Sequence, residues 1–155
     1  MHLLDETVRP EWIDYNGHLY DGYYAVIFAR AVDVFVERIG LTAEVRQATR
    51  HTVYTLETHV RFLREVKLGA PLAVACQVLE VDAKRVRVFL SMRDTSRDVL
   101  AATSEQLLMS IDQGGEAPKS APWLAESGTI LAALAREDAG LPLPEGAGRS
   151  IAIKR

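Results

Sequence analysis

One segment, residues 23–39, is apolar on nearly every side of the helix that its spacing predicts. Alanine and valine make the flanks of the apolar face apolar as well, and Gly40 follows where helices commonly end in a left-handed residue. Such a helix must be enclosed by the rest of the chain, because a surface helix keeps one polar side. The apolar face consists of Tyr24, Ile27, Phe28, Ala31, Phe35 and Ile39.

After this helix the hydrophobic pattern changes to the alternation of a strand. In residues 52–64 we expect Tyr54, Leu56, Val60 and Phe62 to face the helix. Three further strands, joined by connections of hairpin length, are predicted over residues 72–81, 85–93 and 99–111. The remaining expectations are a first strand over 3–9, a short helix or turn over 41–49, a linker over 113–121, an amphipathic helix over 123–137 and an irregular tail.

These elements predict an α+β fold in which a curved antiparallel sheet wraps a long central helix, the hotdog arrangement. A flat sheet could not cover a helix that is apolar on most sides, so the strands must curl around it. We expect one domain over residues 1–155, with its core in 3–112 and a C-terminal helix and tail in 122–155. The open edges of a curled sheet need a partner, which predicts a homodimer.

Composition narrows the function classes. The formal charge of −3 argues against a general nucleic-acid partner, whose electrostatic footprint would be basic. Cys76 is the single cysteine and reads as a buried small hydrophobe. We expect no signal peptide, no membrane span and a cytoplasmic location. The four histidines lack metal-ligand spacing, so we predict no metal.

The segment Asp14-Tyr15-Asn16-Gly17-His18 precedes the buried helix. In an extended backbone its carboxylate, amide and imidazole point the same way, because alternate residues share a face. The start of the following helix adds free N–H groups and the positive end of the dipole. An acid, an amide donor and a titratable base beside a helix start are the parts of an acyl-transfer hydrolase.

The chain resembles single-domain hotdog acyl-CoA thioesterases, and within them most resembles the betainyl-CoA thioesterases of bacterial carnitine degradation. The resemblance covers roughly residues 8–112 and rests on four stretches. It implies hydrolysis of a short acyl-CoA, by a homodimer or a tetramer, without a cofactor. The matching stretches are Trp12 to His18 with Tyr23-Tyr24, Glu57 to Gly69, Lys84-Arg85, and Ser104-Glu105-Gln106.

The same resemblance implies site residues. In plant acyl-carrier-protein thioesterases an Asn and a His assist hydrolysis with an acidic residue on the next long strand, which implies Asn16, His18 and Glu65 here. In bacterial hydroxybenzoyl-CoA thioesterases the position of Asn16 is an Asp nucleophile or base. An amide can be neither, so the base is Asp14, His18 or Glu65. Strict alternation would turn Glu65 away from the helix, unless a bulge near Arg64 or use by a partner subunit intervenes.

Each residue also has a structural reading. Asn16 before Gly17 is a turn signal, His18 could be a helix-entry residue, and Asp14 is expected to orient its neighbours. The aromatic residues around the motif could be core or a cation-binding pocket, since aromatic faces bind quaternary ammonium groups. We predict substrate contacts from Trp12, Tyr15, Gly17, Tyr20, Tyr23 and Glu57, and CoA contacts from Lys84, Arg85 and Arg87.

Two other functions remain open from the sequence. One is a non-catalytic hotdog module that binds an acyl-CoA or regulates a complex. The other is hydrolysis of a thioester carried on an acyl carrier protein rather than on CoA. Ser91 and Ser104 lack the setting of a nucleophile elbow, which argues against a serine hydrolase.

Overall fold

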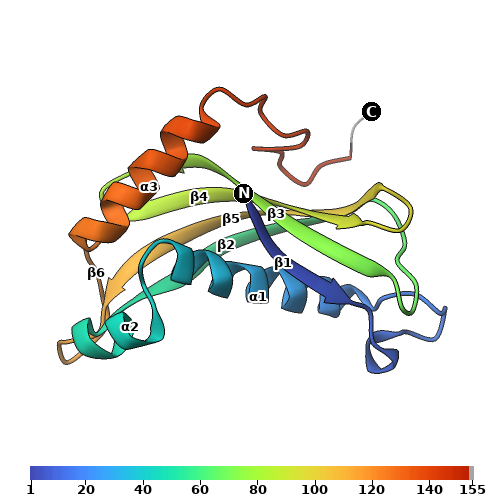
Figure 1. The fold of residues 1–155 in the computed structure, drawn as a ribbon, viewed down its shortest axis with the longest axis horizontal. Helices are drawn as coiled ribbons and strands as arrows, with labels where there is room; N and C mark the ends of the chain where they lie inside the picture. Colours follow the sequence, from blue (N-terminus) through green and yellow to red (C-terminus); the bar gives the residue numbers. More distant parts are fainter. Residues whose placement is uncertain (154–155) are drawn as a thin grey trace.

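The computed structural model describes residues 1–153, in which six strands form one antiparallel sheet in the order β1-β3-β4-β5-β2, with β6 beside β5. Figure 1 shows the sheet bent into an arch with α1 beneath it and α3 above it. In chain order the elements are β1 (His2–Thr7), the 3-10 helix η1 (Pro10–Trp12), α1 (Asp21–Arg38), α2 (Ala43–Thr49), β2 (His51–Phe62), β3 (Pro71–Val81), β4 (Arg85–Asp94), β5 (Val99–Asp112), β6 (Lys119–Ser120) and α3 (Ala125–Asp138).

The predicted fold class is confirmed. The sheet curls around α1, whose side chains Ile27, Phe28 and Ala31 are fully buried. The helix begins at Asp21, just before the predicted apolar range 23–39, and the Asp21 carboxylate accepts a hydrogen bond from the Gly22 N–H and complements the dipole in the first turn. Gly40 follows the helix with φ +85°, as expected for a residue that ends it.

The predicted facing of β2 is wrong in part. A bulge between Thr55 and Glu57 adds a residue, so the side chains before and after it alternate out of phase. Tyr54 lies opposite Met109, on the outer face of the sheet. Phe62 does face the helix, and its ring meets that of Tyr24 edge to face with centroids 5.1 Å apart. Strict alternation could not place all four apolar residues, since one bulge reverses the face.

The outer face of the sheet is covered by α3 and by the tail after it. At the end of α3 the Asp138 carboxylate accepts a hydrogen bond from the Val78 N–H, beside a bulge in β3. The tail then crosses the outer face, as Figure 1 shows. The Arg61 guanidinium donates to the Glu145 carbonyl, and a Cβ on Gly146 would collide with that guanidinium. The backbone of Gly146 takes φ +89°, which favours glycine, and a larger residue would also require Arg61 to move.

Strand β2 ends the sheet, with β5 on one side and no strand on the other within residues 1–153. Apolar side chains are exposed along this edge and on the neighbouring flank of α1: Val26, Tyr54, Leu56 and Phe62. None of the helices in the described part of the chain is long and apolar enough to cross a membrane.

Candidate active site

A tight loop between η1 and α1 carries the predicted catalytic motif. Ile13 and Leu19 pair in an isolated antiparallel β-bridge, and the Asp14 N–H donates to the His18 carbonyl at 2.8 Å. Gly17 takes φ +78° at the tip, which explains the Asn-Gly pair. The Asp14 carboxylate accepts hydrogen bonds from the backbone N–H groups of Asn16 at 2.8 Å and His18 at 3.1 Å. Asp14 thus orients its neighbours through their backbones.

The loop then docks on the segment after β2, which brings His18 to Glu65. The Leu19 N–H donates to the Val66 carbonyl at 2.7 Å, and His18 bridges Lys67. The His18 Nε2 lies 3.0 Å from a Glu65 carboxylate oxygen. The alternation that turned Glu65 away from the helix does not apply, because β2 ends at Phe62. The structure thus brings together two of the three candidate bases as a pair.

A cavity of about 520 Å³ opens beside this pair. Its charged lining is mainly acidic, with Asp14, Asp21 and Glu65 set against Arg64. Aromatic rings form much of the remaining wall, and burial raises the pKa of the Tyr24 hydroxyl, so that group stays neutral. The aromatic lining residues are Tyr15, Tyr20, Tyr24 and Phe62, and His18, Leu19 and Leu63 complete the cavity.

Asn16 stands at the tip of the loop with its side chain exposed. It is not among the lining residues of the cavity, and within residues 1–153 its amide group has no hydrogen-bond partner. The start of α1 offers fewer free N–H groups than predicted, because the Tyr23 N–H donates to the Tyr20 carbonyl at 2.9 Å. The Tyr23 N–H could therefore bind a thioester oxygen only if that bond opened.

Trp12 and Tyr23, two predicted substrate contacts, do not line the cavity. Trp12 is buried, its ring stacks on Tyr23 with centroids 5.5 Å apart, and the Arg9 guanidinium lies 4.8 Å from its centroid. These contacts occupy both rings, so the cavity presents other aromatic faces to a ligand. Tyr15 and Tyr20, which are 95% and 52% exposed, are the predicted aromatic contacts that the structure places at the cavity.

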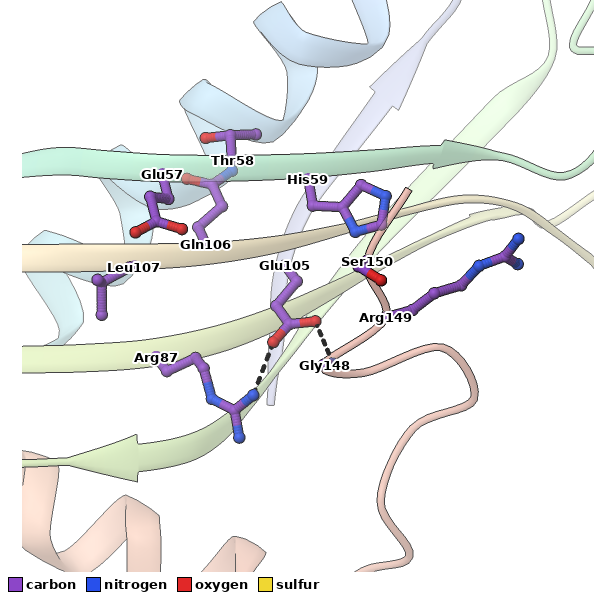
Figure 2. A pocket seen from close by; sticks show the side chains of 10 residues that line it. All are labelled: Glu57, Thr58, His59, Arg87, Glu105, Gln106, Leu107, Gly148, Arg149 and Ser150. Carbon is purple, nitrogen blue, oxygen red and sulfur yellow. Dashed lines mark hydrogen bonds and ion pairs between the residues drawn. The ribbon is translucent and has the colours of Figure 1, made fainter. Parts of the chain in front are cut away.

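The structure places Glu57 elsewhere. It lies on the outer face of the sheet, in a separate pocket of about 330 Å³ with Arg87, Glu105 and Gly148 (Figure 2). The predicted grouping of Glu57 with the aromatic pocket is therefore not found within one chain. Glu57 lies after the bulge in phase with His59, on the outer face, whereas Phe62 of the cavity faces the helix.

The predicted CoA contacts are largely paired with carboxylates. Arg85 donates to Asp82 in the turn between β3 and β4, and three hydrogen bonds from Lys84 and Arg85 lower the pKa of Asp82 to about 2. Arg87 pairs with Glu80 at 2.9 Å and with Glu105 at 2.8 Å. Lys84 is exposed. A phosphate at Arg85 or Arg87 would thus compete with an existing partner.

Sequence reasoning missed several side chains of the cavity, among them Tyr24, Phe62 and Arg64. We assigned Tyr24 to the core and Phe62 to a packed strand, and gave Arg64 no role beyond a bulge. All three line the cavity because the chain turns at the end of β2 beside the start of α1. The end of that strand was the missing signal, and no residue pattern in 52–64 marks it.

The geometry suits attack of water on an activated acyl group. His18 can take a proton while Glu65 stabilises the imidazolium that forms, an arrangement typical of general base catalysis. The cavity beside the pair has room for a short acyl group. Together with the wrapped helix, this makes the cavity the candidate site of an acyl-transfer hydrolase of the hotdog class.

Comparison with known proteins agrees. The thioesterase-like superfamily matches residues 8–134, and the chain belongs to that family. A betainyl-CoA thioesterase of Pseudomonas aeruginosa is 41% identical over 149 residues, which are 96% of this chain and 92% of that protein. The expectation of a thioester hydrolase is thereby confirmed against a non-catalytic module.

Two further proteins are similar to this chain over nearly its whole length. An L-carnitine dehydrogenase/betainyl-CoA thioesterase of Rhizobium meliloti is 37% identical over 155 residues. The match spans 100% of this chain but 31% of that longer protein. A Staphylococcus aureus protein solved in complex with CoA is 30% identical and superimposes with a TM-score of 0.89, covering 99% of this chain and 96% of that one.

Proposed function

We propose that this chain hydrolyses betainyl-CoA to betaine and CoA. The lining of the cavity beside His18 and Glu65 carries the proposal. A betainyl group ends in a quaternary ammonium, which aromatic faces and carboxylates attract. The cavity offers Tyr15, Tyr20 and Tyr24 together with the carboxylates of Asp14 and Asp21. The names of the Pseudomonas and Rhizobium relatives support the same acyl group, and the L-carnitine dehydrogenase in the Rhizobium name supports a role in carnitine degradation.

In the proposed reaction, water attacks the thioester carbonyl carbon and passes a proton to His18. Glu65, 3.0 Å from His18 Nε2, stabilises the imidazolium. The C–S bond then breaks, and the leaving thiolate takes the proton. We assign the carbonyl oxygen to the Asn16 amide, which is exposed at the loop tip and free to turn toward a bound substrate.

We further propose that the active unit is a homodimer. The free edge of β2 and the exposed flank of α1 present Val26, Leu56 and Phe62, and an unpaired apolar edge invites pairing with a second copy. Phe62 lines the cavity, so a partner on this edge would also close the site. Analytical ultracentrifugation at micromolar concentration checks this, and a monomer there contradicts it.

The test of substrate is a comparison of betainyl-CoA with its uncharged isostere, in which carbon replaces nitrogen. Both fill the same space, but the isostere lacks attraction to the aromatic faces and carboxylates. We expect kcat/KM for betainyl-CoA to be roughly ten- to a hundredfold higher, as one or two such contacts allow. Release of free thiol measures both rates.

Variants of the cavity rings sharpen this test. Tyr15→Leu and Tyr20→Leu should reduce the preference for betainyl-CoA, whereas kcat/KM for the neutral isostere should stay within about twofold. Equal hydrolysis of both substrates by the unchanged protein would remove the cation pocket and leave a thioesterase of another acyl preference.

A further inference from the structure

The turn between β4 and β5 reaches the loop that carries Glu65. Its anchor is Asp94, whose side chain is 1% exposed. One carboxylate oxygen accepts hydrogen bonds from the Ser96 N–H at 3.0 Å, the Ser96 hydroxyl at 2.6 Å and the Arg97 N–H at 3.3 Å. The other accepts from Arg97 Nε at 2.7 Å. Both oxygens of this buried carboxylate are thus engaged, which orders the turn.

The guanidinium of Arg97 also donates to a second acceptor, outside the turn. While Nε is held by Asp94, one terminal nitrogen donates to the Glu65 carbonyl at 2.6 Å. A planar guanidinium fixes the relative position of two acceptors, which an ammonium cannot do. The two residues at the bond are 32 positions apart in the chain, so this contact joins separate parts of the fold.

The remaining hydrogen bonds of this loop act on the residues around Glu65. The N–H groups of Leu63 and Arg64 both donate to the Ala101 carbonyl, and the Val66 carbonyl accepts from Leu19. Within residues 1–153, Arg97 provides the hydrogen bond to the Glu65 carbonyl itself. A shift of that carbonyl would move the Glu65 carboxylate, which sits 3.0 Å from His18.

We propose that Arg97, anchored by Asp94, is a positioning residue that holds Glu65 in place for its pairing with His18. Arg97 does not line the cavity, so it acts through Glu65 and not on the substrate. The inference rests on the proposed function, in which the His18–Glu65 pair activates water. Arg97 thus contributes to the catalytic geometry although it contacts neither His18 nor the cavity.

The test is a double-mutant cycle between Arg97→Gln and Glu65→Gln. Arg97→Gln should lower kcat on the hydrolysed acyl-CoA about ten- to a hundredfold, as displacement of a catalytic group does, with KM within about twofold. In the Glu65→Gln background the same change should have little further effect, because Arg97 then has no catalytic carboxylate to hold. Arg97→Lys should recover part of kcat, since one ammonium can replace one of the two bonds.

Arg93→Gln is the matched control. Arg93 lies at the same turn and donates to Asp98 at 2.7 Å, but it has no hydrogen bond to the Glu65 loop within the described residues. Its removal should leave kcat within about twofold. Hydrogen exchange of the amides of residues 64–67 should accelerate in Arg97→Gln and not in Arg93→Gln.

The results distinguish a failure of the role proposed for Arg97 from a failure of the proposed function. An equal loss of kcat from Arg97→Gln with and without Glu65 would show a purely structural role and overturn the inference. So would an unchanged kcat in folded Arg97→Gln while Glu65→Gln is impaired. If Glu65→Gln itself keeps full kcat, the proposed water activation fails, and the catalytic role of Arg97 falls with it.

Discussion

Glu65 and Glu105 are both glutamates beside a cationic or titratable partner, yet the structure treats them differently. Glu105 has a side chain only 13% exposed, and its oxygens accept from Arg87 at 2.8 Å and from the Gly148 N–H at 2.7 Å (Figure 2). Glu65 is 55% exposed, and its carboxylate contacts His18 at 3.0 Å beside a cavity. A carboxylate with both oxygens engaged holds structure, and one with capacity left at a cavity can do chemistry.

The first way to break this comparison is to remove the imidazole. His18→Gln should lower kcat by about 10²- to 10⁴-fold, the range for loss of a general base. His2→Gln is the matched control, because His2 also pairs with a carboxylate, Asp5, at 3.1 Å, but on β1 away from the cavity. Thiol release at saturating substrate measures both. A folded His18→Gln protein with full kcat would place the base elsewhere.

Asn16 tests whether the exposed loop tip belongs to the site. Asn16→Ala should lower kcat about 10²-fold through loss of an oxyanion donor. The backbone N–H of residue 16, which donates to Asp14 at 2.8 Å, is kept in this variant, so the loop should survive. Circular dichroism and thermal unfolding check the fold. An unchanged kcat would remove Asn16 from the mechanism and leave it as a turn residue.

The Glu105 side of the comparison predicts a loss of stability without a loss of chemistry. Glu105→Gln should lower the free energy of unfolding by roughly 1–3 kcal/mol, because the partly buried Arg87 and the Gly148 N–H lose a charged acceptor. Glu80→Gln removes a 70% exposed partner of the same arginine and should cost at most about 1 kcal/mol. Urea unfolding measures both variants. Equal costs would contradict the difference in burial, and a large fall in kcat for Glu105→Gln would contradict the division of roles.

The smallest expected effect is on the loss of stability at low pH. Hydrogen bonds from Lys84 and Arg85 lower the pKa of Asp82 to about 2, below its ordinary value. A lowered pKa in the folded state means that Asp82 contributes stability above its ordinary pKa of about 4 and loses it as the pH falls through about 2. Asp82→Asn should therefore weaken the fall in urea midpoint between these two pH values. The same fall in both proteins would exclude Asp82 as a contributor.

The architecture could be predicted because it rests on local patterns. A helix apolar on most sides has one solution, enclosure, and the alternating runs after it with hairpin connections define an antiparallel meander. The motif at residues 14–18 likewise announced a turn before a helix start, and Gly17 takes the expected left-handed backbone. These features depend on neighbours in the chain, so the sequence by itself determined them.

Other features depended on contacts between distant residues, and only the tertiary structure decided them. One bulge in β2 moved Tyr54 to the outer face, and the end of that strand at Phe62 brought Glu65 to His18. The hydrogen bond from Arg97 to the Glu65 carbonyl joins residues 32 positions apart in the chain. A bulge or a strand end shifts every side chain after it, and its position is set by packing against other strands, which no local pattern records.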